Sequence, residues 1–427
     1  MKTRNPQNHA FDIRAMIYPD DLPGIRRIWR EVGWVDADEA KHVDDFFSVG
    51  KTLLATIDGE PECSVHTVQG SLSLQDTPVP LCAVTAVTTS RIGRGHAFAK
   101  RLTALQLQQA AADGAQVAAL GMFDQGFYDQ LGFGSGGYDH ELKFDPATLK
   151  VNHRVPTPRR IGVDDYKSVH AAMCKRQKVH GSVVLFDDML MKSELNWTQD
   201  GFGLGYGDAE ELTHFMWLSG TGEHGPYRVT AMAYQNTDQL LELLGLLKSL
   251  ADQVYSVKMI QPPHIQLQDL LERPFRTRGT TSGGKHANEQ YSFAWWQLRI
   301  VDVAACVSAF QATQPVSFQL ELTDPVSALL ADEKSEQGAG VSVSDKNWLG
   351  AGGSYVVELG AQSRAFPGSD PDLPELTCSI NAFTRLLWGV AKATSLAVTD
   401  DFKAPLDLLK ALDRAVVLPT PHTGWDF

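Results

Sequence analysis

The sequence has 427 residues, of which 43% are hydrophobic, 21% charged and 9% aromatic, values that exclude a largely disordered or fibrous chain. Lys and Arg total 38 against 51 Asp and Glu, and the resulting formal charge of -13 argues against a nucleic-acid partner, because such binders need a basic face. An acidic chain is better suited to cationic ligands such as amines.

The cysteines and the N-terminal residues predict a cytoplasmic protein. The five cysteines are widely spaced and form no CxxC motif, a pattern typical of reduced thiols rather than of a disulfide scaffold. The first residues lack the apolar stretch of a signal peptide. Glu242 and Lys248 interrupt the most apolar run, 240–250, which is also too short to span a bilayer, so we expect no membrane partner.

Hydrophobic periodicity predicts alternating helices and strands in the first third of the chain. Apolar residues at helical spacing indicate surface helices, and short β-branched apolar runs indicate buried strands. The expected elements are a helix over 22–32, strands over 52–57 and 81–87, a helix over 96–113, a strand over 116–122 and a short helix over 127–131.

Two polar stretches predict domain boundaries in the rest of the chain. Residues 146–158 are proline-bearing, and residues 278–288 are rich in Gly, Ser and Lys. Between them we expect a helix over 166–176, strands over 202–206, 214–217 and 227–233, and a helix over 237–251. After the second boundary we expect several strands and helices over 380–391 and 405–412. The length of 427 residues agrees with several domains, since a domain holds roughly 100–200 residues.

Common catalytic signatures are absent from the sequence. No two histidines lie three or four residues apart as zinc ligands would, and no GxSxG motif marks a hydrolase nucleophile. We therefore expect no metal cofactor.

One glycine-containing loop has the composition of an anion site. A strand that ends in Thr85-Ala86-Val87 leads into residues 91–97, which open the helix over 96–113. Its glycines allow close backbone approach, and free N–H groups at a helix N-terminus bind anions, with Arg91 and Arg94 adding positive charge. Pyrophosphate is the natural ligand for such a site. An ordinary strand–turn–helix crossover is the alternative on this loop alone.

A second motif follows about thirty residues later. The segment from Leu120 to Gly134 contains Phe127-Tyr128-Asp-Gln-Leu131-Gly132-Phe133 and resembles the tyrosine-bearing segment of GNAT acetyltransferases. The upstream loop fits the family's Arg/Gln-x-x-Gly-x-Gly/Ala pattern at Gly95 and Ala97. It departs from that pattern at Ile92, where Arg or Gln is usual.

The layout of the whole chain is similar to the Eis (enhanced intracellular survival) branch of these proteins. The resemblance implies an α/β (α+β) fold with two tandem GNAT-fold domains, each with a mixed central sheet, and a C-terminal sterol-carrier-protein-like α+β domain. The expected domains are 1–148 with the acetyl-CoA site, 149–288 as a degenerate GNAT domain, and 289–427, whose C-terminus reaches the active site. The resemblance also implies a homo-oligomer, commonly a hexamer.

The same resemblance implies an activity and its groups. An acetyl group would pass directly from acetyl-CoA to a primary amine of a cationic small molecule, aminoglycoside-like or polyamine-like. The Phe427 carboxylate would be the base and Tyr128 the acid. The expected cofactor-binding residues are Thr85, Ala86, Val87, Gly93, Arg94, Gly95, His96, Ala97, Phe98, Phe123 and Asp124.

The acceptor pocket and the function have open alternatives. Trp29, Trp34, Asp36 and Asp426 are candidate acceptor residues, since aromatics and carboxylates suit a cationic amine, although core tryptophans and solvated acids are equally expected. One rival function is a lipid- or sterol-binding module, which is supported by the resemblance of the third domain to sterol carrier proteins. Another is a non-catalytic acetyl-CoA-binding protein, which is supported by the departure from the loop pattern at Ile92.

Overall fold

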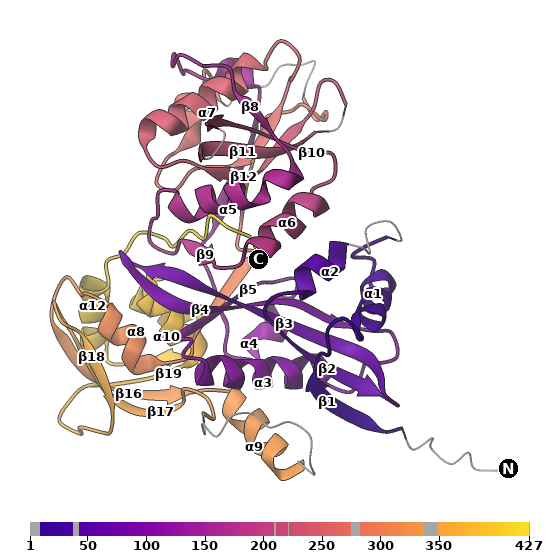
Figure 1. Ribbon diagram of the computed structural model, residues 1–427. Coiled ribbons are helices and arrows are strands. Elements are labelled where there is room, and N and C mark those ends of the chain that lie inside the picture. The colour runs from indigo at the N-terminus through magenta and orange to yellow at the C-terminus, as the bar shows by residue number, and fades with distance from the viewer. Residues whose placement is uncertain are drawn as a thin grey trace. The chain divides into compact units, whose positions relative to one another are not determined.

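The computed structural model describes residues 9–36, 42–208, 211–220, 222–274, 282–336 and 348–426, without the side chains of 332–336. Contacts between residues divide the described chain into two compact units (Figure 1). The first unit holds residues 9–136 and 296–419, and the second holds 137–295 and 420–426. No helix among the described residues is both long and apolar enough to cross a bilayer. All five cysteines are free.

The first unit is built around a mixed sheet with the strand order β1-β2-β3-β4-β5-β15-β6. Most neighbours are antiparallel, but β4 and β5 are parallel. The strands are β1 (Phe11–Ala15), β2 (Lys51–Ile57), β3 (Glu60–Leu74), β4 (Thr77–Thr89), β5 (Val117–Gly121), β6 (Gly134–Ser135) and β15 (Trp296–Ile300).

Four helices accompany this sheet in the first third of the chain. They are α1 (Leu22–Glu31), α2 (His42–Phe47), α3 (Phe98–Ala112) and α4 (Gln125–Asp129). Helices α1 and α2 lie on one face of the sheet and α3 on the other (Figure 1). Phe98, Leu102 and Leu105 of α3 are buried against apolar side chains of β2–β5. This burial removes apolar surface from water and stabilises the packing of the helix on the sheet. This core also contains Tyr128 and Phe133.

The C-terminal part of the first unit adds a five-stranded sheet with the order β18-β17-β16-β19-β20. Its strands are β16 (Val316–Thr323), β17 (Gly353–Leu359), β18 (Arg364–Pro367), β19 (Glu375–Ser379) and β20 (Phe402–Lys403). The helices of this part are α8 (Val303–Ala309), α9 (Val326–Glu336), α10 (Ile380–Leu387), α11 (Ala393–Thr399) and α12 (Leu406–Ala415). Helix α10 packs against β15 and β6 of the first sheet, so the two sheets share one unit.

The second unit contains a seven-stranded sheet with the order β14-β7-β13-β12-β11-β10-β8. The unit's strands are β7 (Asp139–Phe144), β8 (Arg159–Ile161), β9 (Val183–Leu185), β10 (Gly201–Gly207), β11 (Leu212–Gly220), β12 (Tyr227–Ala233), β13 (Val257–Ile260) and β14 (Glu289–Phe293). Its helices are α5 (Tyr166–Lys175), α6 (Asp188–Trp197) and α7 (Thr237–Ser249). Leucines of α7 pack on the sheet and form the core of the unit.

The mixed α/β fold class is confirmed. The division into 1–148, 149–288 and 289–427 stays a prediction. Strand β7 pairs within the sheet of the second unit, and β15 lies between β5 and β6 of the first sheet. Residues 278–281 of the expected second boundary lie outside the described residues.

Candidate active site

The site begins where the parallel pairing between strands β4 and β5 ends. Their ladder runs from Leu81 opposite Val117 to Ala83 opposite Ala119. Beyond this point β5 pairs only with β15 on its other side, and no described strand covers this edge of β4. A gap between the carboxyl ends of adjacent parallel strands is a common place for ligands in α/β proteins.

Strand β4 has a β-bulge shortly after the point where its pairing with β5 ends. His66 of β3 pairs with Thr85 and Ser64 pairs with Thr88, so Ala86 and Val87 together oppose one residue of β3. Ala86 has a positive φ of 51°, which turns the local backbone out of the regular ladder. The predicted residues Thr85, Ala86 and Val87 are therefore the irregular part of this strand.

The predicted pyrophosphate loop leaves β4 and leads into α3. Gly95 and Ala97 both have left-handed backbones, with φ of 87° and 56°, and Ala97 is the N-cap residue of the helix. Among the described residues, no acceptor pairs with the N–H groups of Arg94, Gly95, His96, Ala97 or Phe98. Gly93 packs tightly, since a Cβ there would lie 2.8 Å from the carbonyl oxygen of Glu62. The backbone of residues 94–98 thus offers several donors to an anion.

The side chains around this loop have different surroundings. Phe98 is buried in the core, so only its N–H group can serve a ligand. The His96 ring stacks on Phe98, with centroids 5.2 Å apart. Ile92 is 64% exposed, and Arg94 is exposed as well. The Arg91 side chain is engaged elsewhere, because its Nη2 donates to the carbonyl oxygen of Glu31 at 3.3 Å, and its backbone N–H group donates to Glu31 Oε2 at 3.1 Å.

Tyr128 lies on helix α4, which follows β5 on the other side of the gap. The side chain of Asp124 caps this helix by accepting a hydrogen bond from the Phe127 N–H group at 3.3 Å. The Tyr128 ring contacts the rings of Phe127, Phe133 and Phe123, and Phe123 itself is 74% exposed.

The environment of Tyr128 keeps its phenol protonated. The side chain is only 2% exposed, and its hydroxyl has no hydrogen-bond partner among the described residues. Burial raises the pKa of Tyr128, and the nearby Asp124 carboxylate raises it further. A neutral, unpaired hydroxyl on the helix that follows β5 is able to donate a proton.

The candidate acceptor residues of the first unit differ in accessibility. Trp29 is 4% exposed and lies in an aromatic cluster with Phe46 and Phe47. Trp34 is 46% exposed, and its ring meets that of Trp29 edge-on at 5.2 Å. Asp36 is exposed beside it in the chain. The ring of Trp34 is therefore accessible to a ligand, whereas Trp29 supports it from the core.

A pocket of about 560 Å³ lies along one side of α1. It is lined by Pro23, Arg26, Arg27, Arg30, Glu31 and Arg91. Carboxylates neutralise much of its charge: Arg26 pairs with Asp44, and Arg27 bonds to Glu62 at 3.0 Å. This arginine-lined pocket is chemically unsuited to a cationic amine.

Asp426 belongs to the second unit, in a segment that is firmly held there. The carbonyl oxygen of Thr423 accepts hydrogen bonds from the Val183 N–H group at 2.9 Å and from Arg176 Nη2 at 3.1 Å. Trp425 is buried, and its indole N–H group donates to Glu194 Oε1 at 3.3 Å. Phe427, the predicted base, lies outside the described residues.

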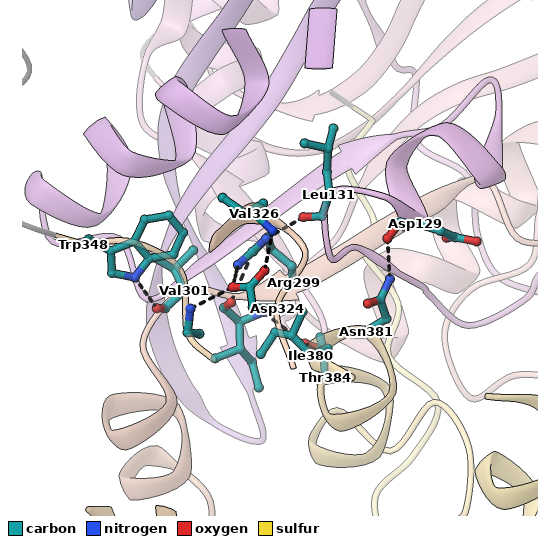
Figure 2. Close-up of polar contacts among 12 residues, drawn as sticks. Asp129, Leu131, Arg299, Val301, Asp324, Val326, Trp348, Ile380, Asn381 and Thr384 are labelled. Atoms are coloured by element: carbon teal, nitrogen blue, oxygen red, sulfur yellow. Dashed lines mark hydrogen bonds and ion pairs between the residues drawn. The ribbon is translucent and has the colours of Figure 1, made fainter. Parts of the chain in front are cut away.

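The described residues contain no cluster of three His, Cys, Asp or Glu side chains that could hold a metal ion. Side chains from the C-terminal part of the first unit hold the turn that follows Tyr128: Arg299 and Asn381 (Figure 2), together with Gln297. None of these three was predicted, because donors that lie so far away in the chain leave no local sequence signal.

Part of the chain matches a known protein family. Residues 13–136 match the family model described as acetyltransferase (GNAT) domain. This range holds the β4–β5 gap, the loop over 91–97 and Tyr128. Residues 13–136 are a GNAT acetyltransferase domain. The predicted GNAT acetyltransferase domain is confirmed over these residues, and with it the class of enzyme, an acyl-CoA-dependent acetyltransferase.

Solved structures extend the likeness in fold beyond the GNAT domain. A probable N-acyltransferase from Enterococcus faecalis superposes with a TM-score of 0.77 at 15% identity, covering 98% of this chain and 100% of that chain. Eis1 from Mycobacterium abscessus gives 0.73 at 15% identity with the same coverage. A GCN5-related N-acetyltransferase from Anabaena variabilis gives 0.74 at 14% identity, again with that coverage. No curated protein matches the sequence significantly.

Proposed function

We propose that this protein transfers an acetyl group from acetyl-CoA to a primary amine of a cationic small molecule, polyamine-like or aminoglycoside-like. The observation that supports the proposal is the end of the β4–β5 ladder at Ala83 and Ala119, followed on the β4 side by the loop with the unpaired N–H groups of residues 94–98 and on the β5 side by helix α4 with Tyr128. We propose further that the protein works as a homo-oligomer, with a hexamer as the expected state.

The backbone would bind the acyl donor. The N–H groups of residues 94–98 would hold the pyrophosphate, since the dipole of α3 favours negative charge at this end. Gly93 and Gly95 would let the phosphates approach the main chain. The irregular backbone over Thr85–Val87 would donate to the thioester carbonyl oxygen, where negative charge develops during the transfer. Phe123 and Asp124, at the start of the Tyr128 segment, would border the pantetheine end.

Tyr128 would be the general acid. The amine nitrogen forms a bond to the carbonyl carbon, the carbon–sulfur bond breaks, and the departing thiolate takes the proton of the Tyr128 hydroxyl. The raised pKa of Tyr128 keeps that proton in place until sulfur leaves.

The base would be the Phe427 carboxylate, as the resemblance implies. It would take the proton that the attacking amine loses, through a water molecule because a carboxylate is a weak base.

The acceptor would be a cation. The exposed ring of Trp34 and the carboxylate of Asp36 are suited to an ammonium group, and the net charge of -13 favours cationic ligands generally. Asp426 remains the other candidate carboxylate from the sequence.

Free-thiol release tests this function. The full chain is incubated with acetyl-CoA and, one at a time, spermidine, spermine and kanamycin, with glycine ethyl ester as a monoamine control. The proposal predicts thiol release that depends on the polyamine, together with one acetyl-CoA site per chain by calorimetry. A lipid-binding module would bind no acetyl-CoA, and a non-catalytic binder would bind it without releasing thiol.

A further inference from the structure

The turn that follows Tyr128 is fixed by residues from outside the GNAT domain. Its backbone folds tightly, since the carbonyl oxygen of Tyr128 accepts hydrogen bonds from the N–H groups of Leu131 at 2.9 Å and Phe133 at 3.2 Å. The carbonyl oxygen of Asp129 accepts a hydrogen bond from the N–H group of Gly132 at 3.1 Å, and the carbonyl oxygens of Leu131 and Phe133 follow in the same turn. All three accept hydrogen bonds from side chains of residues 299 and 381.

Asn381 joins the two ends of this turn. It is the second residue of α10, and its Nδ2 donates to the carbonyl oxygen of Asp129 at 3.0 Å (Figure 2). The same Nδ2 donates to the carbonyl oxygen of Phe133 at 2.7 Å. Asp129 directly follows Tyr128 in the chain, and the Phe133 ring contacts the Tyr128 ring. One amide group therefore fixes both the backbone and a ring neighbour of Tyr128.

Arg299 holds the middle of the turn. It is fully buried on β15, and its Nη1 donates to the carbonyl oxygen of Leu131 at 2.5 Å. Its Nη2 bonds to Asp324 Oδ2 at 2.5 Å, and Asp324 also accepts from the N–H group of Ala351 (Figure 2). The guanidinium lies 5.5 Å from the centre of the Trp348 ring. Asp324 and Trp348 thus fix the Arg299 side chain independently of its bond to the turn.

Gln297, also on β15, completes the set. Its Nε2 donates to Asp129 Oδ1 at 2.7 Å. Carbonyl groups at a helix end need partners, and Arg299 and Asn381 supply them, while Gln297 binds the carboxylate of Asp129. All three residues lie 160 or more positions later in the chain.

We propose that Asn381, Arg299 and Gln297 are positioning residues for the acetyl transfer, because they set where the Tyr128 hydroxyl lies. The inference rests on the proposed role of Tyr128 as acid. Small displacements of a catalytic group lower the rate steeply, since a shift of about 1 Å can cost about 10²-fold. The C-terminal part of the first unit therefore tunes the turnover of the GNAT domain without touching substrate.

A double-mutant cycle between Tyr128 and Asn381 tests this. Asn381→Ala, Tyr128→Phe and the double variant are assayed for kcat and for KM of acetyl-CoA, with spermidine as acceptor. Thr384→Val is the matched control: Thr384 is buried on the same helix and bonds to the Ile300 N–H group, but has no contact with the turn. We expect Asn381→Ala to lower kcat about 10- to 100-fold in the wild-type background, with KM unchanged.

The cycle separates positioning from general support. If Asn381 acts through Tyr128, Asn381→Ala costs little further kcat once Tyr128 is Phe. An equal loss of kcat in both backgrounds, or no loss in either, overturns the inference. A silent Tyr128→Phe variant contradicts the proposed function instead. If Asn381→Ala does not fold, Gln297→Met serves in the same cycle, because it removes the donor to Asp129 and keeps the side-chain volume.

Discussion

A Cβ atom on Gly132 would lie 2.7 Å from Nη1 of Arg299. Gly132 has a φ of 80°, so an L-residue at this position is also strained by its own backbone. The glycine that follows Tyr128 and Leu131 is therefore required twice: once for the turn, and once for the approach of Arg299.

Gly132→Ala is predicted to destabilise the protein by more than the strain of a left-handed alanine, which is about 1–2 kcal/mol. It should also lower kcat, because Arg299 must move away from the turn. Urea unfolding and steady-state kinetics measure both effects. Gly114→Ala is the matched control, since Gly114 has a φ of 90° and open space around it. Equal losses of stability in the two variants would contradict the close contact with Arg299.

Gly95→Glu is predicted to weaken acetyl-CoA binding at least about tenfold, because a carboxylate in the loop repels the pyrophosphate. Calorimetry measures the Kd directly. Gly59→Glu is the control: Gly59 has nearly the same φ, 89° against 87°, and both glycines have open space around them. The account predicts normal binding in the Gly59 variant. Unchanged affinity in the Gly95 variant would place the pyrophosphate elsewhere.

Glu194→Gln is predicted to change how stability depends on pH. Burial raises the pKa of Glu194 to about 8, and the Asp426 carboxylate adds to this shift. Below the ordinary glutamate pKa of about 4.5, the wild type and the variant are both neutral at this position. Between pH 4.5 and 8 the unfolded chain ionises while the folded protein holds its proton, so the wild type loses stability relative to the variant as pH rises.

Thermal melts of the two proteins from pH 5 to pH 9 measure this difference. The variant's advantage in Tm should grow through this range and level off above pH 8. Glu60→Gln, at an exposed position on β3, is the control and should show no such trend. A constant difference in Tm between wild type and Glu194→Gln would contradict the raised pKa.

Adding residues after Phe427 is predicted to abolish acetylation while leaving the fold and the Kd for acetyl-CoA unchanged. The reason is chemical: the proposed base is an α-carboxylate, which an extension converts into an amide. A tag of the same length at the N-terminus should leave the rate unchanged. Acetylation at the native rate by the extended protein would move the base to another group, with Asp36 as the next candidate.

Local signals in the sequence predicted much of the fold. The apolar spacing that predicted a helix over 22–32 corresponds to α1 at Leu22–Glu31, and the predicted strand over 227–233 is β12. Strand β3 was missed, because Ser64, His66, Thr67 and Ser73 interrupt its apolar pattern although all four are buried. Burial of polar side chains depends on partners from other strands, such as the hydroxyl of Thr88 that bonds to Ser64.

The candidate site was predictable only where it is continuous in the chain. The loop over 91–97 contains the glycines and arginines expected of its proposed role as an anion site. The segment around Tyr128 contains the tyrosine motif expected of its proposed role as an acid. The bulge at Ala86 depends on the pairing of β3 with β4, which sequence periodicity does not specify. The bonds from Asn381 to Asp129 and Phe133 join residues 252 and 248 positions apart, so no local pattern could predict them.

Turnover by Tyr128→Phe tests the central claim most directly. The substitution removes one oxygen atom from a side chain whose ring packs in the core and whose hydroxyl has no partner among the described residues. It should therefore leave folding and the Kd for acetyl-CoA intact. The account predicts that kcat for amine acetylation falls about 10²–10⁴-fold, the usual scale for loss of a general acid. A kcat within twofold of the wild type would contradict it.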